Sequence, residues 1–186
     1  GDQGFGQLTL TIGKYYRVTG ESTQHRGVDP DITLPSHIDA TVVGESVRDS
    51  ALPWDTIRTT EFRAGAPLDS TIDSLTANHI TRSKDDPDFQ YLLEGIRDVE
   101  EARARKTMSL NIDKRIQERE ENMARRLERE NARRAALQLE PLENVEQLEE
   151  LEGPDVHLDQ AAAIITDLAI IREVKASPTQ TAQRAE

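Results

Sequence analysis

Only one stretch of this chain has the alternating pattern of a β-strand, and that limits the folds open to it. Residues 8–12 alternate leucine or isoleucine with threonine, and residues 14–18 continue with aromatic and β-branched side chains. Turn-forming residues follow from 19 to 32. A lone strand leaves its backbone hydrogen-bonding groups unpaired, and even a hairpin is only marginally stable in water. We therefore expect this strand to need a sheet that the rest of the chain does not obviously supply.

The pattern becomes helical near Leu68, after a turn-rich extended connection over residues 35–67. Asp69 or Ser70 is placed to cap a first helix, and Asp86 followed by proline predicts the start of a second. A break is expected over 107–111. The predicted fold class is therefore mainly α with a short N-terminal β segment.

A long charged helix is predicted from Asn111 to Leu139. Its apolar residues form a narrow stripe, which favours a solvated helix with one side on a neighbour and leaves a coiled-coil arm as the alternative. Residues 140–159 follow with eight acidic side chains and no lysine or arginine. This acidic run either stays solvated as a linker or folds back on the arginines that precede it, and its leucine and valine spacing suggests that part of it is helical.

The last predicted helix is the most amphipathic one. Asp159 is expected to cap it, and it carries a broad apolar face that closes the core of the helical domain or docks against another domain or protomer. Residues 179–186 are expected to be disordered. The residues of the apolar face are Ala161, Ile164, Ile165, Leu168, Ile170 and Ile171.

Composition excludes several functional classes. A net charge of −12 argues against nucleic acid and anionic membranes as partners. No segment approaches the roughly 20 apolar residues that span a bilayer. The chain has 0 cysteines, which suits an oxidising compartment and the cytosol equally well. Its 4% aromatic content predicts a thin or helical core.

Within residues 8–34 the sequence resembles the closing segment of the carboxyl-terminal processing proteases, a family of serine peptidases. That family has a K-Y-Y-x-x-x-G-x-S-x-Q run followed by G-[IV]-x-P-D-I. Shorter matches at 52–55, 86–90, 109–111 and 154–159 extend the likeness to its tail-specific protease branch. The residues that match the first two runs are Lys14, Tyr15, Tyr16, Gly20, Ser22, Gln24, Gly27, Val28, Pro30, Asp31 and Ile32.

The resemblance implies a serine nucleophile with a lysine general base, in a serine-rich run and a G-K-G-x-x-Q run. Neither run occurs in residues 1–186, and in the family both lie upstream of the segment that opens this chain. We therefore expect a carboxyl-terminal fragment without catalytic residues. On this interpretation residues 1–34 end the catalytic domain as a remnant of its sheet, 35–67 connect, and 68–178 form a helical C-terminal domain.

The family implies a periplasmic endopeptidase that acts on proteins with exposed apolar carboxyl termini. The expected partners are the rest of the protease chain, unfolded or tagged protein substrates, a lipoprotein adaptor and a second copy of the chain. The helical part would brace the enzyme or dock a substrate or adaptor, and the isolated fragment is expected to be inactive. The alternative is a stand-alone helical interaction module whose likeness to the family is only ancestral.

Some residues invite a catalytic interpretation but are better explained as structural. Lys14 is not the catalytic lysine of the family pattern, and Ser22 is expected to bond local backbone in its turn. His25 would complete a triad with Asp29 or Asp31, but no nucleophile-elbow pattern surrounds Ser22.

No metal or cofactor is expected, because the remaining histidines lack the spacing of metal ligands. The only tryptophan, Trp54, is expected to fill a packing pocket and to anchor the connection. The histidines are His37, His79 and His157.

Overall fold

The computed structural model describes residues 6, 11–39, 41–63, 65 and 67–176, with the side chains of the last helix described as far as 173. The chain forms two compact units, Gly1–Pro67 (unit 1) and Leu68–Glu186 (unit 2). The division expected at residue 34 stays a prediction about the domains of a longer chain. The tail expected to be disordered, 179–186, lies outside the described residues.

The short N-terminal β segment was wrongly predicted. Among the described residues of unit 1 the only regular element is one 3₁₀ turn, η1 (Glu45–Val47), and residues 8–10 of the expected strand lie outside the described part. Tyr16 pairs with Ser22, and Glu21 with Thr56, as isolated antiparallel bridges. Among the described residues, no second long strand lies beside residues 11–18, so their backbone groups have no ladder to join.

A tight turn at Gly20 lies against the segment around Ile57, which is distant in the sequence but in the same unit. Its N–H donates to the Arg17 carbonyl at 2.8 Å, and its carbonyl accepts from the Ile57 N–H at 2.8 Å. Gly20 has a φ of 89°, and a Cβ built there would lie 2.2 Å from the Ile57 carbonyl oxygen. Both the backbone conformation and the close approach of residue 57 therefore require glycine at this position.

Gly20→Ala is expected to destabilise unit 1 by more than the roughly 1–2 kcal/mol of left-handed backbone strain, since the Ile57 segment must also move. Hydrogen exchange should show faster exchange at the Ile57 amide. Gly13→Ala is the matched control, because a Cβ at Gly13 meets nothing within 4 Å and its φ is not positive. Equal exchange rates in the two variants would contradict this account of Gly20.

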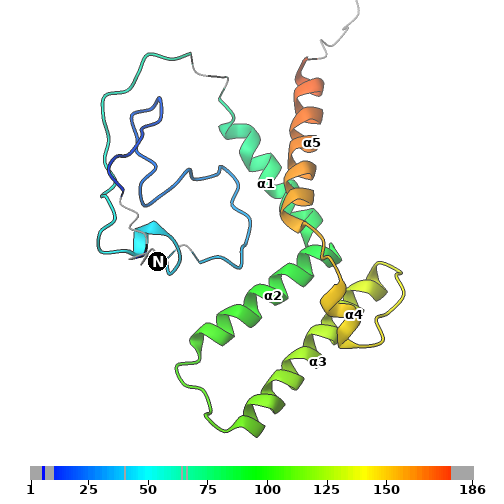
Figure 1. The fold of residues 1–186 in the computed structure, drawn as a ribbon. Helices are drawn as coiled ribbons and strands as arrows, with labels where there is room; N and C mark the ends of the chain where they lie inside the picture. Colours follow the sequence, from blue (N-terminus) through cyan, green and yellow to red (C-terminus); the bar gives the residue numbers. More distant parts are fainter. Residues whose placement is uncertain (1–5, 7–10, 40, 64, 66, 177–186) are drawn as a thin grey trace, which may run out of the picture. The chain divides into compact units, whose positions relative to one another are not determined.

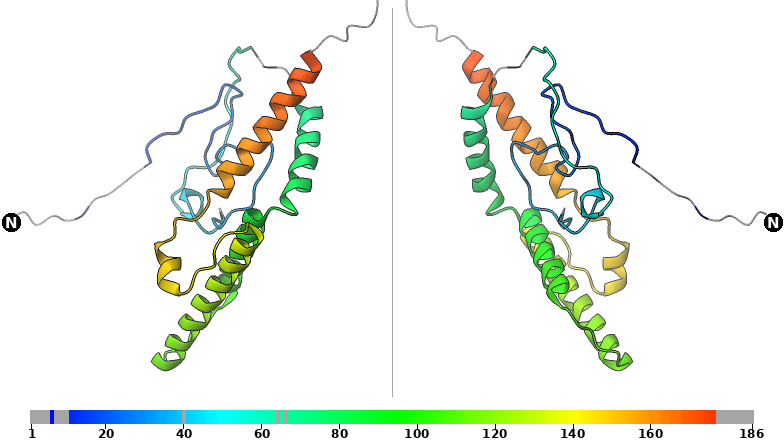
Figure 2. Two further views of the ribbon diagram at one scale, coloured as in Figure 1. Left: turned by 90° about the vertical axis from the view of Figure 1, so that its right-hand side faces the viewer. Right: turned by 90° about the vertical axis from the view of Figure 1, so that its left-hand side faces the viewer.

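Unit 2 is helical, as the sequence predicts. Helix α1 packs along α5, α2 and α3 form an antiparallel hairpin, and α4 lies against α3 (Figures 1 and 2). The hairpin turns at residues 105–111, a segment that includes the predicted break at 107–111. The bounds are α1 Asp69–Ser83, α2 Pro87–Ala104, α3 Ile112–Ala136, α4 Val145–Glu150 and α5 Val156–Ala176.

Side-chain caps explain where three of these helices begin. The Asp86 side chain accepts from the Asp88 and Phe89 amides, with proline at the first position of α2, as predicted. Asn111 caps α3 and Asn144 caps α4. Helix α3 packs on α2 and is mostly solvated, but only the second half of its predicted stripe, Met123 and Leu127, is half-buried. Ile112 and Ile116, in the first half of the stripe, are exposed.

The cap of α1 and the start of α5 were predicted wrongly, whereas α1 does begin near Leu68 as expected. Helix α1 has Leu68 at its N-cap with no side-chain cap, and Asp69 lies in its first turn, where a negative charge favours the helix dipole. Helix α5 begins at Val156, before the expected cap, because the Asp155 carboxylate accepts from the Leu158 amide at 3.0 Å.

The core of unit 2 is thin. Phe89, Leu92 and Val156 form its buried cluster, with Leu93 and Ile96 packed against it. The apolar face predicted on α5 is divided: Ile164 and Leu168 are half-buried, whereas Ile165 and Ile170 are exposed. Unit 2 therefore depends on few apolar contacts, and polar contacts become important to its helix packing.

Candidate functional site

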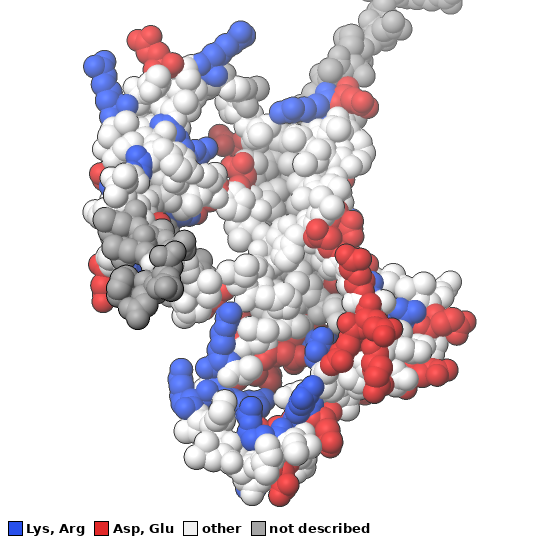
Figure 3. Space-filling view, viewed as in Figure 1, with Lys and Arg blue, Asp and Glu red and all other residues white. Residues whose placement is uncertain are grey.

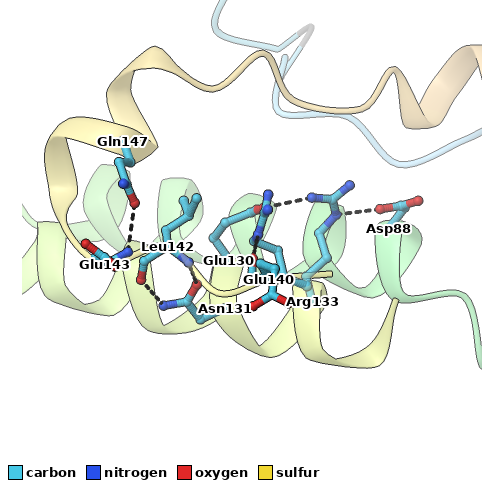
Figure 4. A network of polar contacts seen from close by, with 9 residues as sticks. Asp88, Glu130, Asn131, Arg133, Glu140, Leu142, Glu143 and Gln147 are labelled. Atoms are coloured by element: carbon cyan, nitrogen blue, oxygen red, sulfur yellow. Dashed lines mark hydrogen bonds and ion pairs between the residues drawn. The ribbon is translucent and has the colours of Figure 1, made fainter. Parts of the chain in front are cut away.

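A buried ion-pair network joins α2 to α3. The Glu130 carboxylate, on a residue only 1% exposed, accepts from Arg133 Nη1 at 2.8 Å and lies 3.9 Å from Arg134 Nη1. Arg133 Nε also donates to Asp88 Oδ1 at 2.5 Å, across the hairpin (Figure 4). Burial opposes the charge of Arg133, but the Asp88 hydrogen bond and the Glu130 charge outweigh it, and the pKa of Arg133 is raised.

The ring of Tyr91 reinforces this contact between the helices. The guanidinium of Arg129 lies 5.0 Å from its centroid, and that of Arg133 lies 5.7 Å away. Arg129 also pairs with Asp98 on α2. Cation–π contacts of this kind are favourable, more so when partly desolvated. The network therefore links α2 to α3 through paired charges, although the buried Nε of Arg129 has no hydrogen-bond partner.

The acidic run after α3 folds back onto it, mainly through neutral groups. The Asn131 amide exchanges two hydrogen bonds with the Leu142 backbone, at 2.9 and 2.7 Å (Figure 4). Arg134 Nε donates to the Glu140 carbonyl, not to its carboxylate, at 2.5 Å. Leu148 is 6% exposed, so it docks α4. The solvated-linker prediction is thus wrong for residues 140–150, and the partly helical one is confirmed.

An exposed apolar groove with arginine walls lies at the free end of the hairpin. We call it the tip groove; its volume is about 610 Å³ and it is open to solvent. Met108 and Leu110 in the adjoining turn are 67% and 97% exposed, and Ile112 at the start of α3 is 67% exposed. Contiguous exposed apolar side chains of this kind mark interaction surfaces. The groove is lined by Arg105, Ile112, Arg115, Ile116, Glu118, Arg119, Asn122, Met123 and Arg126.

The sequence did not single out this groove. The interrupting turn was predicted, but the apolar residues inside it were assigned no role. Their signal was present: three exposed apolar side chains within five residues, beside several arginines on one helical stripe.

The two candidate catalytic residues of unit 1 have structural partners. Lys14 Nζ lies 2.8 Å from Asp55 Oδ1 and donates to the Pro53 carbonyl at 2.7 Å. Ser22 is 2% exposed, and its hydroxyl accepts from the Asp55 amide at 3.4 Å. The structure thus brings the K-Y-Y and G-x-S residues together around the L-P-W-D segment.

Asp55 is the centre of this arrangement. The hydrogen bond from Lys14 is the main reason that the pKa of Asp55 is lowered. Desolvation, followed by the hydrogen bond to Asp55, raises the pKa of Tyr16, whose hydroxyl lies 3.3 Å from Asp55 Oδ2. Asp55 was recognised in the sequence only as part of a motif, so its partners were found from the structure.

The remaining candidates are not assembled into a site. His25 is exposed with a φ of 63°, and Asp29 pairs with Arg26 at 2.9 Å. His79 is buried and bonds Gln160 at 3.2 Å. Trp54 is 37% exposed, with the Arg26 guanidinium 5.3 Å from its ring, so its side chain is less enclosed than expected. Within the described ranges, no group of histidine, aspartate and glutamate side chains is arranged to hold a metal ion.

The fold and the groove together define a helical domain with an exposed groove of apolar and arginine side chains. The family described as "C-terminal domain of tail specific protease (DUF3340)" matches residues 38–170. The chain is also 37% identical over 169 residues to the tail-specific protease of Haemophilus influenzae, covering 89% of this chain and 24% of that protein. The chain belongs to the family of tail-specific protease C-terminal domains.

The chain spans about a quarter of the length of the Haemophilus influenzae relative. The matched family region begins within unit 1 and covers unit 2 as far as residue 170, within α5. Among the described residues, no helix is both long and apolar enough to cross a membrane.

Proposed function

We propose that this chain is the C-terminal part of a periplasmic serine-type endopeptidase that degrades or processes proteins from exposed apolar carboxyl termini. In this proposal the Ser/Lys dyad lies elsewhere in the parent protein. The chain itself braces the enzyme and offers a docking surface to substrates or to an adaptor. Membership in the tail-specific protease family supports the parent activity.

The contacts of Lys14 and the burial of Ser22 support the proposal that this chain does not supply the catalytic residues. A lysine base must be neutral to take a proton, and a serine nucleophile must reach the substrate carbonyl. Lys14 Nζ is instead held by the Asp55 carboxylate and the Pro53 carbonyl, and Ser22 is buried, so neither side chain is placed to act on a substrate.

The purified chain is therefore expected to show no turnover of an unfolded substrate with an apolar carboxyl terminus. The assay would follow release of new amino termini, with the complete protease as positive control. Turnover that survives Lys14→Ala would mean that a different dyad exists in this chain. Turnover that Lys14→Ala abolishes would make Lys14 the base. Either result would overturn the proposal.

A stand-alone interaction module is the second candidate, and the exposed tip groove favours it. Expressing the remainder of the protease separately and mixing it with this chain distinguishes the two. A protease part should form a stable complex with the remainder, because unit 1 would complete its fold. A module of independent function should elute alone.

A further inference from the structure

Unit 2 carries a second exposed surface whose chemistry is the opposite of the tip groove. We call it the acidic ledge: α4 and the chain that follows it to Asp159. Leu148 points into the unit, whereas Glu146, Glu149 and Glu150 are exposed on α4. Leu151 and Leu158 add exposed apolar surface, at 36% and 64%. The ledge therefore combines carboxylates with leucines, as the groove combines arginines with isoleucines and methionine.

The charges of the two surfaces separate sharply within one unit. The groove lining holds four arginines and one glutamate in a chain whose net charge is −12. From Glu140 to Asp159 there are eight acidic residues and no basic one. Figure 3 shows lysine and arginine gathered over the free end of the hairpin and aspartate and glutamate gathered over α4, on one face of unit 2.

The ledge cannot cover the groove of its own chain. The groove is lined mainly by the first half of α3. The segment that leads into the ledge is held by the second half of α3, where Asn131 bonds the Leu142 backbone. Ile116 and Asn131 are separated by about 22 Å of helix at 1.5 Å per residue. A contact between the groove and the ledge therefore requires two copies of the chain.

We propose that the tip groove binds the acidic ledge of a second copy of this chain. Two copies of α3 placed antiparallel bring each groove opposite the other copy's ledge. A two-fold axis then makes the same contact twice, so the assembly closes as a dimer. The opposite charges fix how the two copies are aligned, and the apolar side chains between them are buried from water in the interface. This pairing is independent of the catalytic proposal, because it uses only unit 2.

Paired charge reversals test the proposal by sedimentation of the complete chain at physiological ionic strength. Arg115→Glu with Arg119→Glu reverses the groove, and Glu149→Arg with Glu150→Arg reverses the ledge. All four side chains are exposed, so the fold should tolerate both variants. Each variant alone should weaken self-association by at least about tenfold. Mixing the two, or combining all four substitutions in one chain, should restore it, because every contact is again between opposite charges.

Asp73→Arg with Glu173→Arg is the matched control, because both residues are exposed in unit 2 outside the two surfaces. It should leave the dimer unchanged. A wild-type chain that stays monomeric at high concentration would overturn the proposal, as would a dimer indifferent to both reversals. A synthetic peptide of residues 140–159 that binds a monomeric chain would show that the groove takes an acidic segment of another protein instead.

Discussion

Replacing Phe89 with alanine is expected to lower the stability of unit 2 by about 3–5 kcal/mol, the usual loss for a buried phenylalanine. Phe89 is 7% exposed and lies in the cluster with Leu92 and Val156, so it joins α2 to α5. Its ring also meets the edge of His79 from α1, with centroids 5.3 Å apart. One substitution thus removes contacts among three helices of a thin core.

Urea unfolding followed by far-UV circular dichroism measures the Phe89→Ala effect. Ile80→Ala is the matched control, since Ile80 lies on α1 but is 50% exposed. It should change the free energy of unfolding by no more than about 0.5 kcal/mol. A small loss in both variants would mean that this cluster does not dominate the packing of unit 2.

Arg133→Ala is expected to cost about 3–5 kcal/mol, because it removes the close partner of a buried carboxylate. Glu130 would keep only Arg134, at 3.9 Å, and Asp88 would lose its contact across the hairpin. The double variant Glu130→Leu/Arg133→Met replaces the pair with apolar side chains of similar size. It should be clearly more stable than Arg133→Ala alone, since no buried charge is left without a partner.

Arg125→Ala is the control for Arg133→Ala. Arg125 lies on the same helix, is exposed, and donates to the exposed side chain of Asn122 one turn earlier in α3. Denaturant unfolding of all three variants measures the difference. If Arg133→Ala and Arg125→Ala lose equal stability, the network contributes little. If the double variant is less stable than Arg133→Ala, the buried charge is not the source of the loss.

Helix boundaries were the part of the fold that the sequence predicted best. Asp86 with Pro87, and Asn111 after the predicted break, set their helix starts through local hydrogen bonds within a few residues. Such signals do not depend on tertiary contacts, so they can be read without a structure. The predicted cap was wrong for α1, where Leu68 makes no side-chain cap. The predicted start was wrong for α5, where Asp155 accepts from the Leu158 amide in place of the expected Asp159.

The strand and the contacts of Asp55 could not be predicted in the same way. Residues 11–18 have a strand pattern, but a strand forms only when a partner lies beside it, and pairing is a property of distant segments. Asp55, which pairs with Lys14, lies 41 positions further along the sequence. These pairings join segments distant in sequence, which the local pattern does not encode. The tip groove is different, because all of its lining residues except Arg105 lie on α3, so its signal was in the local sequence.

Asp86 has a consequence for the helix packing of unit 2. One carboxylate oxygen accepts the amides at the start of α2, and the other accepts from Gln160 Nε2 on α5 at 2.6 Å. Gln160 in turn contacts His79 on α1. Asp86 therefore couples the start of α2 to α5, and through Gln160 to α1, by side-chain hydrogen bonds between residues 74 and 81 positions apart in the sequence.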